Sequence, residues 1–571
     1  MASTATLRSR RSAAQLHALA GVEREIRASD PNSRRKYLVD FSEAFRSYDS
    51  VLEPGKLPDV LQQADIILVG DYHALPASQR YAASLIKTLG APPFSAGENG
   101  PREIVVGFET VFSRDQHILE EWMRGEIGES ELRERIRFDL DWGYEWEPFY
   151  ELLSSAREHA SAIYGLDCMP REDLRKIGAR DRHAAIKITE MRQRHPEALI
   201  VVLFGESHLA PNHLPRLLYE RLRTDRVLTI LQNVDALYWR AAGESCDRVE
   251  AVQVTDDVIC VFNSTPLEKY ESYRLCLDRW RREGFGSPDL GPAIYNLIDG
   301  LLRFLDMNAY SPHNTTQPRF LVDSLPEVYR RTGDSVLRKL LSRKPVEEWT
   351  RKSLLKDFEQ RGSVYLPHVN AFYIRDFQMM HAAEQAARFL HHACRGLPLR
   401  NGNANKLPPP SPSDRFYTQA LEHALAYFGS RVLYPGRPAV READLYDLYD
   451  QTGEDLRQQM SLGISEFTEL LDFLVLHRGF ELNPARYLET PPQITDGVQY
   501  TGEKLDYAAR QLGYMLGSNL YDAYLEGRVS RRYIKTLFLL HLDEPDVATQ
   551  AYFNLAAKVR PEKKRPRSVR K

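Results

Sequence analysis

Two apolar runs in this sequence end in the same four-residue pattern, Gly-x-x-His. The run in "IILVGDYHAL" leads into Asp71 and His73, and the run in "IVVLFGESHL" leads into Glu206 and His208. Imidazole nitrogens and carboxylate oxygens are donors that bind zinc, manganese, iron and cobalt in proteins. The same groups move protons in acid–base catalysis, and a histidine can also face a bound tetrapyrrole. The pattern therefore predicts a site for a metal ion, for haem or for acid–base chemistry.

Acidic residues follow two further apolar runs at the matching position. Glu109 comes after the run in "EIVVGFET", and Asp167 comes after the run in "IYGLD". Because successive positions are apolar, the runs indicate strands buried on both faces of a parallel sheet. The carboxyl ends of parallel strands meet at one edge, where ligand crevices lie. We therefore expect these acids and the two histidines to line one crevice, with helix capping as the alternative role of Asp167.

The residue types at this crevice suggest definite roles. The predicted metal ligands are His73, His208, Asp71 and Glu109. In a hydrolase, Glu109 or Glu206 would be the catalytic base that activates a metal-bound water. A bound tetrapyrrole would face the two histidines, with Glu109 close by. Arg180 could bind a propionate or carboxylate group of the ligand, and a salt bridge on a helix surface is its alternative role.

The elements that must position these residues are short β-branched runs that alternate with longer amphipathic ones, from about residue 38 to 285. Such alternation is typical of βα units on a mostly parallel sheet. Strands are predicted at 66–70, 103–108, 161–166, 199–204, 227–233 and 257–262, and helices between them include 76–89 and 113–124. The sequence therefore predicts a three-layer α/β sandwich.

After about residue 290 helical patterns replace the strand pattern, which predicts an all-α C-terminal half. Helices are expected at 292–306, 371–395, 416–428, 440–460, 464–476 and 503–526. The predicted divisions are an N-terminal extension (1–37), the α/β domain (38–288), a helical region (289–395), a Pro/Asn-rich linker or loop (396–414), a second helical region (415–558) and a disordered basic tail (559–571).

The helix "HAAEQAARFLHH" carries a second group of potential ligands. His381 and Glu384 share one face, and His391 and His392 lie about two turns further on. This spacing is compatible with a metal-binding element of a helical bundle. Because no second helix of this kind occurs, a solvated face or a satisfied core histidine is the preferred interpretation.

Composition limits the possible partners and location of the protein. The chain has 571 residues, of which 43% are hydrophobic and 27% charged, and its net charge is -3. These values indicate about two to four globular domains and no general attraction to nucleic acid or membranes, apart from weak contacts through the basic tail. Five scattered cysteines without a CxxC pair suggest a reducing compartment. Without a signal peptide, a lipobox or a transmembrane run, the predicted location is the cytoplasm.

Several common catalytic motifs are absent from the sequence. It contains no GxGxxG, Walker A, GxSxG or HExxH element. These absences count against dinucleotide binding, P-loop nucleotide hydrolysis, serine hydrolase chemistry of the nucleophile-elbow type and the zincin mechanism.

Five segments resemble, in the same order, motifs of the ChaN-like haem-binding domain of the Tiki superfamily. They are "IILVGDYHALPASQRYAASLI", "VVGFETVFSRDQHILEEWMRGEI", "WGYEWEPFYELLSSAREHASAIYGLD", "ARDRHAAIKI" and "VVLFGESHLAPNHLPRLL". The resemblance covers residues from about 40 to 285, and the family's two Gly-x-x-His units and glutamate fall on His73, His208 and Glu109. It implies a ChaN-like α/β sandwich with its site at the carboxyl edge of the sheet.

The resemblance brings in relatives of several kinds: haem-binding bacterial lipoproteins, metal-dependent proteases, and esterases similar to those that open macrolide rings. The leading hypothesis is a bacterial, cytoplasmic protein that binds haem or a divalent transition metal (Fe, Mn, Co or Zn). Its predicted cofactor-binding residues are His73, His208, Glu109 and Arg180. The alternative is a metal-dependent hydrolase of peptides or esters. A third possibility is a non-catalytic scaffold whose C-terminal helical half binds a protein partner.

Overall fold

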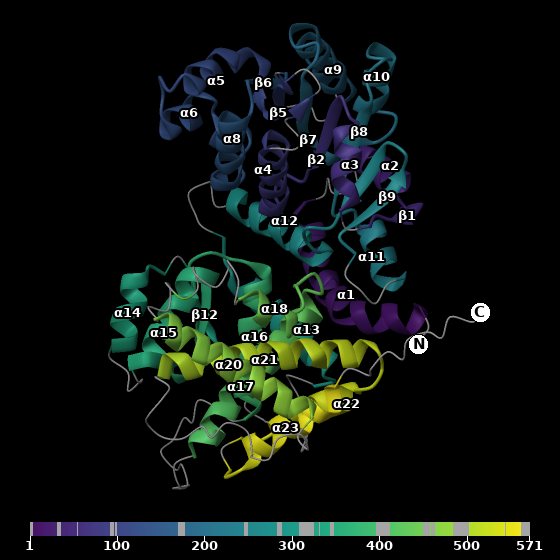
Figure 1. The fold of residues 1–571 in the computed structure, drawn as a ribbon. Coiled ribbons are helices and arrows are strands. Elements are labelled where there is room, and N and C mark those ends of the chain that lie inside the picture. Colours follow the sequence, from purple (N-terminus) through teal and green to yellow (C-terminus); the bar gives the residue numbers. More distant parts are fainter. Residues whose placement is uncertain are drawn as a thin grey trace, which may run out of the picture. The chain divides into compact units, whose positions relative to one another are not determined.

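The chain forms two compact units, Leu19–Pro288 and Met1–Ala18 together with Asp289–Lys571 (Figure 1). The computed structural model describes residues 4–30, 36–53, 55–91, 96–97, 100–168, 177–244, 249–281, 288–307, 325–330, 332–342, 348–395, 411–448, 457, 463–483, 502–542 and 544–560. Each unit is described below by itself.

The first unit is built on an eight-stranded sheet with the strand order β1-β9-β10-β8-β2-β7-β5-β6. The strands are β1 (Ser50–Val51), β2 (Ile66–Asp71), β5 (Ile104–Phe112), β6 (Ala162–Asp167), β7 (Leu199–Gly205), β8 (Val227–Gln232), β9 (Ala251–Thr255) and β10 (Val258–Val261). From β10 to β6 all neighbours are parallel, and only β1 and β9 add antiparallel pairs. The predicted, mostly parallel sheet is confirmed, and β1 and β9 are additions to it.

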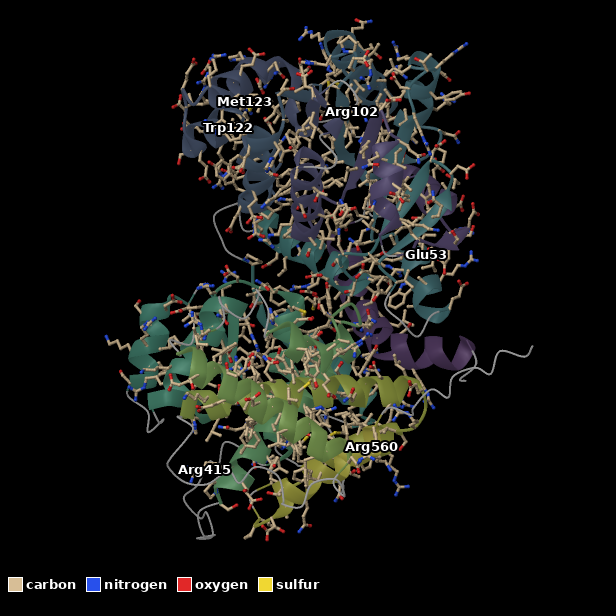
Figure 2. All side chains as sticks on the ribbon, viewed as in Figure 1. Glu53, Arg102, Trp122, Met123, Arg415 and Arg560 are labelled. Atoms are coloured by element: carbon tan, nitrogen blue, oxygen red, sulfur yellow. The ribbon has the colours of Figure 1, made fainter. Side chains whose placement is uncertain are left out.

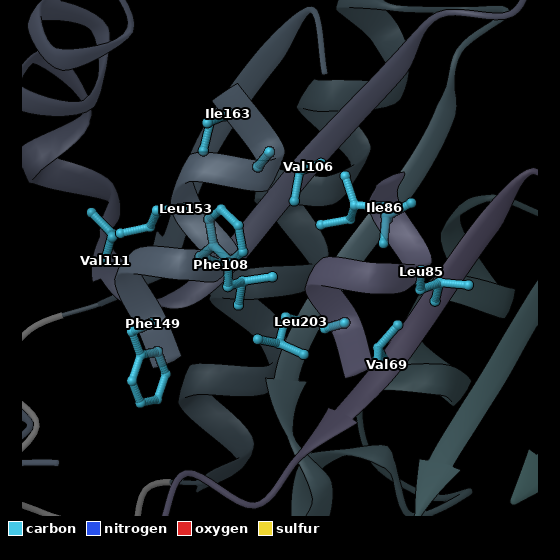
Figure 3. Close-up of a cluster of buried hydrophobic side chains, with 14 of the residues drawn as sticks. Val69, Leu85, Ile86, Val106, Phe108, Val111, Phe149, Leu153, Ile163 and Leu203 are labelled. Carbon is cyan, nitrogen blue, oxygen red and sulfur yellow. The ribbon is translucent and has the colours of Figure 1, made fainter. Parts of the chain in front are cut away.

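Both faces of the sheet are buried under helices, which makes a three-layer sandwich. Because side chains alternate along a strand, Ile67 and Val69 of β2 face one apolar cluster and Ile66 and Leu68 face the other. Figure 3 shows part of the first cluster, in which Val69 lies with Leu85 and Phe149 among the labelled side chains. Burial of each such side chain contributes about 1.5–3 kcal/mol to folding.

The helices over the first face are α3 (Lys56–Gln62), α4 (Pro76–Gly90), α5 (Gln116–Met123), α6 (Glu129–Arg135), α7 (Phe138–Asp141) and α8 (Trp146–His159). Over the second face lie α2 (Lys36–Ala44), α9 (Ile177–Arg194), α10 (Leu214–Arg221) and α11 (Asp235–Glu244). Trp122 of α5, labelled in Figure 2, is buried and its ring centroid lies 6.3 Å from that of Tyr150 on α8. Aromatic packing of this kind fixes the helices to one another and to the sheet.

The remaining elements of this unit are short connections and one long helix. The 3₁₀ helices η1 (Ser113–Asp115) and η3 (Glu206–Leu209) follow β5 and β7 directly, β3 (Ala96–Gly97) pairs with β4 (Gly100–Pro101), and α12 (Pro266–Arg281) follows the last strand of the large sheet. The helix α1 (Thr4–Ser29) precedes them all, and its residues are divided between the two units.

The second unit is mainly helical, as expected for the C-terminal half. Its helices are α13 (Gly291–Phe304), α14 (Asp334–Ser342), α15 (Glu348–Arg361), α16 (Met379–Cys394), α17 (Pro412–Leu433), α18 (Ala443–Asp447), α20 (Ile464–Leu482), α21 (Gly502–Leu525), α22 (Arg531–Phe538) and α23 (Val547–Val559). No helix within the described ranges has the length and apolar character needed to span a bilayer.

A small sheet in this unit was not predicted from the sequence. Strands β11 (Glu327–Arg330), β12 (Ser363–Leu366) and β13 (Ala371–Ile374) form it in the order β11-β13-β12. The helix expected at 371–395 therefore begins only at Met379. A run of four apolar residues suits a strand as well as a helix, so local periodicity cannot distinguish the two. Most of the predicted linker (396–410) and of the basic tail (561–571) lies outside the described residues.

Two glycines bring α21 unusually close to α17. A Cβ atom added at Gly513 would lie 2.5 Å from the carbonyl oxygen of Ala420, and one added at Gly517 would lie 2.3 Å from that of Ala424. Neither position has room for a side chain, so the two helices pack backbone against backbone at this crossing.

Candidate functional site

The four strands that carry these acids and Gly-x-x-His units at or near their carboxyl ends are neighbours in the sheet, in the order β2-β7-β5-β6. The strand predicted at 103–108 continues to Phe112, so Glu109 lies within β5 and not after it. In the β2–β7 register Asp71 lies opposite Gly205, and in the β5–β6 register Phe112 lies opposite Asp167. Their carboxyl ends therefore lie along one edge, as expected for a parallel sheet. The side chains that follow them contact one another there, as described below.

His73 is held by the acid of its own motif. Its Nδ1 lies 2.6 Å from Oδ2 of Asp71, whose Oδ1 accepts a hydrogen bond of 2.5 Å from Gln79 of α4. Asp71 is 2% exposed, whereas the His73 side chain retains 14% exposure. The carboxylate fixes the orientation of the ring and leaves Nε2 for another partner.

Glu109 occupies the centre of the cluster. Its Oε2 lies 3.4 Å from Nε2 of His73 and accepts a hydrogen bond from the backbone N–H of Gly205. Its Oε1 accepts a hydrogen bond from Arg180 and lies 3.8 Å from Nε2 of His208. One buried carboxylate thus lies between the imidazoles of the two Gly-x-x-His motifs.

Gly205 is the residue that lets Glu109 come so close to β7. A Cβ atom at this position would lie 3.0 Å from Oε2 of Glu109 and 3.4 Å from Nε2 of His73. The glycine of the second motif therefore serves a close approach between backbone and carboxylate.

Arg180 is buried and forms a bidentate pair with Asp167. Its Nε and Nη2 lie 2.9 Å from the two carboxylate oxygens, and its Nη1 lies 3.3 Å from Nε2 of His208. The side chain is only 8% exposed, so its interpretation as a surface salt bridge is wrong. Asp167 also accepts the backbone N–H of Cys168 at 2.8 Å. The guanidinium joins the ends of β5 and β6 to the second histidine.

His208 repeats the arrangement of His73 with a different acid. Its Nδ1 lies 2.5 Å from Oδ1 of Asp181, and the other oxygen of Asp181 lies 2.7 Å from Nδ1 of His213. His208 is 3% exposed. Asp181 was not predicted as a site residue, although it lies in the "ARDRHAAIKI" segment, because its partner His208 comes from a 3₁₀ helix further along the chain.

Glu206 does not join this cluster directly. Its two oxygens lie 2.9 and 3.1 Å from Nζ of Lys269 on α12, and that ammonium group lies 4.7 Å from the ring centroid of Tyr72. Lys269 was not predicted as a site residue, and no local pattern distinguishes it from other helix lysines. Glu206, which was predicted as a possible catalytic base, is therefore engaged in an ion pair.

The electrostatics of the cluster favour a protonated His73 beside an ionised Glu109. Burial lowers the pKa of His73, but Asp71 and Glu109 outweigh it and raise that pKa to about 9. Burial raises the pKa of Glu109, but His73 and Arg180 hold it well below its usual range. Burial raises the pKa of Asp71 despite the attraction of His73. The group can store a proton on His73 and release it to a ligand or base.

The donor set suits a single imidazole ligand better than a cage for a metal ion. Among the residues that the structure describes, no group of three or more His, Cys, Asp or Glu side chains is arranged to hold a metal ion. The guanidinium of Arg180 already provides a cation between Glu109 and His208. His73 fits an axial ligand of haem, because a carboxylate holds Nδ1 and its Nε2 contact with Glu109 is longer than an ordinary hydrogen bond.

A known protein family matches the part of the α/β unit that contains the first Gly-x-x-His motif. Residues 57–200 match the family described as "Haem-binding uptake, Tiki superfamily, ChaN". This part of the chain is ChaN-like. The matched range includes His73, Glu109, Asp167 and Arg180, and it ends before the second Gly-x-x-His unit.

One solved structure that matches part of this chain is titled "Cofacial heme binding to ChaN of Campylobacter jejuni". The two chains are 15% identical, the match covers 32% of this chain and 86% of the other, and the TM-score is 0.24. No curated protein matches the chain. The α/β architecture is accordingly assigned from the sheet itself.

Proposed function

We propose that the ChaN-like unit binds haem at the carboxyl edge of its sheet, with Nε2 of His73 as the ligand to iron. The observation that carries the proposal is the position of His73: Asp71 fixes its Nδ1, its Nε2 is paired with Glu109 at 3.4 Å and would leave that partner to bind iron, and 14% of its side chain is exposed. Once it has lost the proton that it carries at neutral pH, the imidazole of His73 would be a common type of axial ligand of haem iron. The match to a haem-binding family supports the same ligand.

Aromatic side chains around His73 suit an apolar macrocycle. The ring centroids of Trp142, Tyr144 and Phe149 lie 5.4, 5.3 and 6.4 Å from that of His73. Trp280 of α12 extends this group, with its centroid 5.5 Å from that of Tyr144 and 38% of its surface exposed. Trp142 and Phe149 are buried in the core, so Tyr144 and Trp280 are the rings of this group that can cover a tetrapyrrole.

The second histidine has a different role in the proposal. Nε2 of His208 faces Arg180 at 3.3 Å, and the side chain is almost fully buried. His208 and Arg180 therefore hold Glu109 in place and set the charge beside His73, and neither contacts the iron. This assignment replaces the pair of histidine ligands expected from the sequence with one ligand and one positioning residue.

A hydrolase of peptides or esters is the second candidate function. The observation in its favour is the pair of carboxylate-held imidazoles on either side of Glu109, since such groups can exchange protons with a substrate. In that case His73 and Glu109 would be the acid and the base, and Glu206 would remain paired with Lys269. A divalent metal, a cytoplasmic location and a protein partner of the helical unit remain predictions.

The test is a haemin titration of the full chain followed by visible absorption, with His73→Ala, His208→Ala and His195→Ala beside the wild type. His195 is a matched control, because its side chain is 18% exposed and its Nε2 lies 3.0 Å from the hydroxyl of Tyr164. It precedes β7, whereas the candidate site lies where β7 ends. We expect a saturable Soret shift in the wild type and in His195→Ala, and its loss in His73→Ala. The His208→Ala variant should bind more weakly but keep the same band position.

Two outcomes would contradict the proposal. A Soret shift that survives in His73→Ala would move haem away from this histidine. The absence of any saturable shift in the wild type would remove haem from the site, and ester and peptide hydrolysis by the same variants would then test the second candidate.

A further inference from the structure

We propose that Ser113 and His183 form a second reactive site, in which Ser113 is a nucleophile toward small carboxylic esters and His183 is its base. Oγ of Ser113 lies 2.9 Å from Nε2 of His183, although the residues are 70 positions apart. Both residues lie within the range that matches the family, whose description concerns haem and names no such pair, and the inference does not depend on haem binding.

The fold brings the two residues together from different elements. Ser113 is the first residue after β5, on the 3₁₀ helix η1, and β5 changes its register against β6 between Phe108 and Phe112. His183 lies on α9, one helical turn after Arg180 and on the same face. Because Arg180 is anchored to Asp167 at the end of β6, α9 is held where His183 meets the serine.

One tautomer of His183 gives this hydrogen bond the direction that a nucleophile needs. Burial and then Lys187 lower the pKa of His183 from 6.5, so the ring is neutral at pH 7. With its proton on Nδ1, Nε2 accepts the hydroxyl proton of Ser113. An adjacent base of this kind is what activates a serine, whose hydroxyl is otherwise a weak nucleophile.

Both partners are accessible, in contrast to the buried cluster at the sheet edge. Ser113 and His183 are each of intermediate exposure. The pair is a dyad, because the carboxylate of Asp167 is committed to Arg180 and forms no hydrogen bond with His183 among the described contacts. We therefore expect slow chemistry on activated esters.

The reaction balances with the two residues alone. Oγ of Ser113 forms a bond to the ester carbonyl carbon, and Nε2 of His183 takes the hydroxyl proton. The bond between that carbon and the alkoxy oxygen breaks, and the leaving alkoxide receives the proton from His183. The products are an acylated Ser113 and a free alcohol, and the ring is again neutral.

The experiment exposes the full chain to p-nitrophenyl acetate at pH 7, with release of nitrophenol followed by absorption and the acetylated residue located by peptide mass spectrometry. We expect one acetyl group on Ser113 in the wild type, none there in Ser113→Ala, and acylation slower on the order of 100-fold in His183→Ala. Ser155→Ala is the control, because Ser155 is also half-buried but donates to the carbonyl of Ala83 at 2.9 Å.

The outcomes separate this inference from the proposed function. Acetylation of Ser113 at the same rate in His183→Ala, or acetylation only at other residues, would overturn the inference. His73→Ala should keep the acetylation of Ser113, and Ser113→Ala should keep the haemin titration of the wild type. Failure of either site can therefore be recognised while the other is intact. Circular dichroism of each variant confirms that a lost signal is not a loss of folding.

Discussion

Each of the two units buries a cluster of charged side chains, but the clusters treat their histidines in opposite ways. In the ChaN-like unit, acids surround His73 and raise its pKa to about 9. In the helical unit, burial and the nearby Arg361 and Arg437 lower the pKa of His381 to about 4, although Glu384 opposes them. The first imidazole is charged at neutral pH and the second is not.

In the helical cluster the charged groups pair with one another. Its members are Glu384, Arg361, Arg437, Tyr514 and His381. Glu384 lies 3.1 Å from Arg361, 2.7 Å from Arg437 and 2.6 Å from the hydroxyl of Tyr514. Its carboxylate is thereby paired with two cations and a hydroxyl, which disfavours it as a metal ligand. The helix is not a solvated face, and His391 and His392 are buried in the core. The comparison shows that the neighbours of a buried imidazole, as well as its burial, decide whether it is charged at neutral pH.

The largest effect is expected from breaking the helical cluster with Glu384→Ala. The variant leaves two buried guanidinium groups without their carboxylate, which should cost about 3–5 kcal/mol of unfolding free energy. Urea denaturation measures the loss, and haemin binding by the ChaN-like unit should be unchanged. The control is Glu359→Ala, since its pair with Arg338 is exposed on both sides and should cost about 1 kcal/mol or less. A loss of haemin binding in Glu384→Ala would show that the two clusters are not independent.

The pH dependence of haemin binding should follow the raised pKa of His73. Iron binds the neutral imidazole, so protons compete with it until the pH exceeds the pKa of about 9. Affinity should therefore rise by about tenfold per pH unit from pH 7 to 9, about 100-fold in total, and level off above that. Titrations at five pH values give the curve. An affinity that is flat from pH 7 to 9 would contradict the charged state of His73.

Stability should change with pH in the opposite direction. Because the pKa of His73 is raised on folding, its pairing with Asp71 and Glu109 is fully present below about pH 6.5 and is lost as the pH rises through about 9. Unfolding free energies measured across this range should fall more steeply in the wild type than in His73→Ala. Equal slopes in the two proteins would show that another group carries the dependence.

The two motif glycines offer a smaller and more local test. Gly205→Ala places a methyl group 3.0 Å from Oε2 of Glu109 and 3.4 Å from Nε2 of His73, so it should cost about 1–3 kcal/mol and weaken haemin binding. Gly70→Ala is matched to it, because its nearest new neighbour is Cδ1 of Leu209 at 3.4 Å, an ordinary contact. Equal effects of the two substitutions on haemin binding would argue against the close approach at Gly205.

The smallest change is expected for His381→Leu. The ring is neutral, and its Nδ1 has no hydrogen-bond partner among the described residues, so its removal leaves no charge unpaired. The unfolding free energy should shift by about 1 kcal/mol or less. A much larger loss would mean that the histidine supports Glu384 through a contact other than charge.

The sequence was sufficient to predict the parallel strands of the large sheet and the convergence of their ends, because parallel strands buried on both faces are apolar throughout. Asp71, His73 and Glu109 could be named for this reason, since each directly follows or ends such a run. The three-layer α/β architecture followed from the alternation of strands and helices.

The partners of these residues could not be predicted, because they come from helices whose inward faces depend on the assembled fold. Arg180 and Asp181 are adjacent on α9, yet one reaches Asp167 and the other reaches His208. Lys269 finds Glu206 across 63 positions. Nothing in the local pattern of a helix shows that an arginine or lysine will be buried against a carboxylate from a distant strand.

The position of β2 in the sheet has a consequence for synthesis of the chain. This strand and the motif that follows it are made early, but both of its neighbours come much later, β7 beginning at Leu199 and β8 at Val227. Until those residues leave the ribosome, a strand that is apolar on both faces has both of its hydrogen-bonding edges unpaired. Such segments favour aggregation in nascent chains. We therefore expect folding of the nascent chain to depend on rapid synthesis of β7 and β8 or on a chaperone that covers β2.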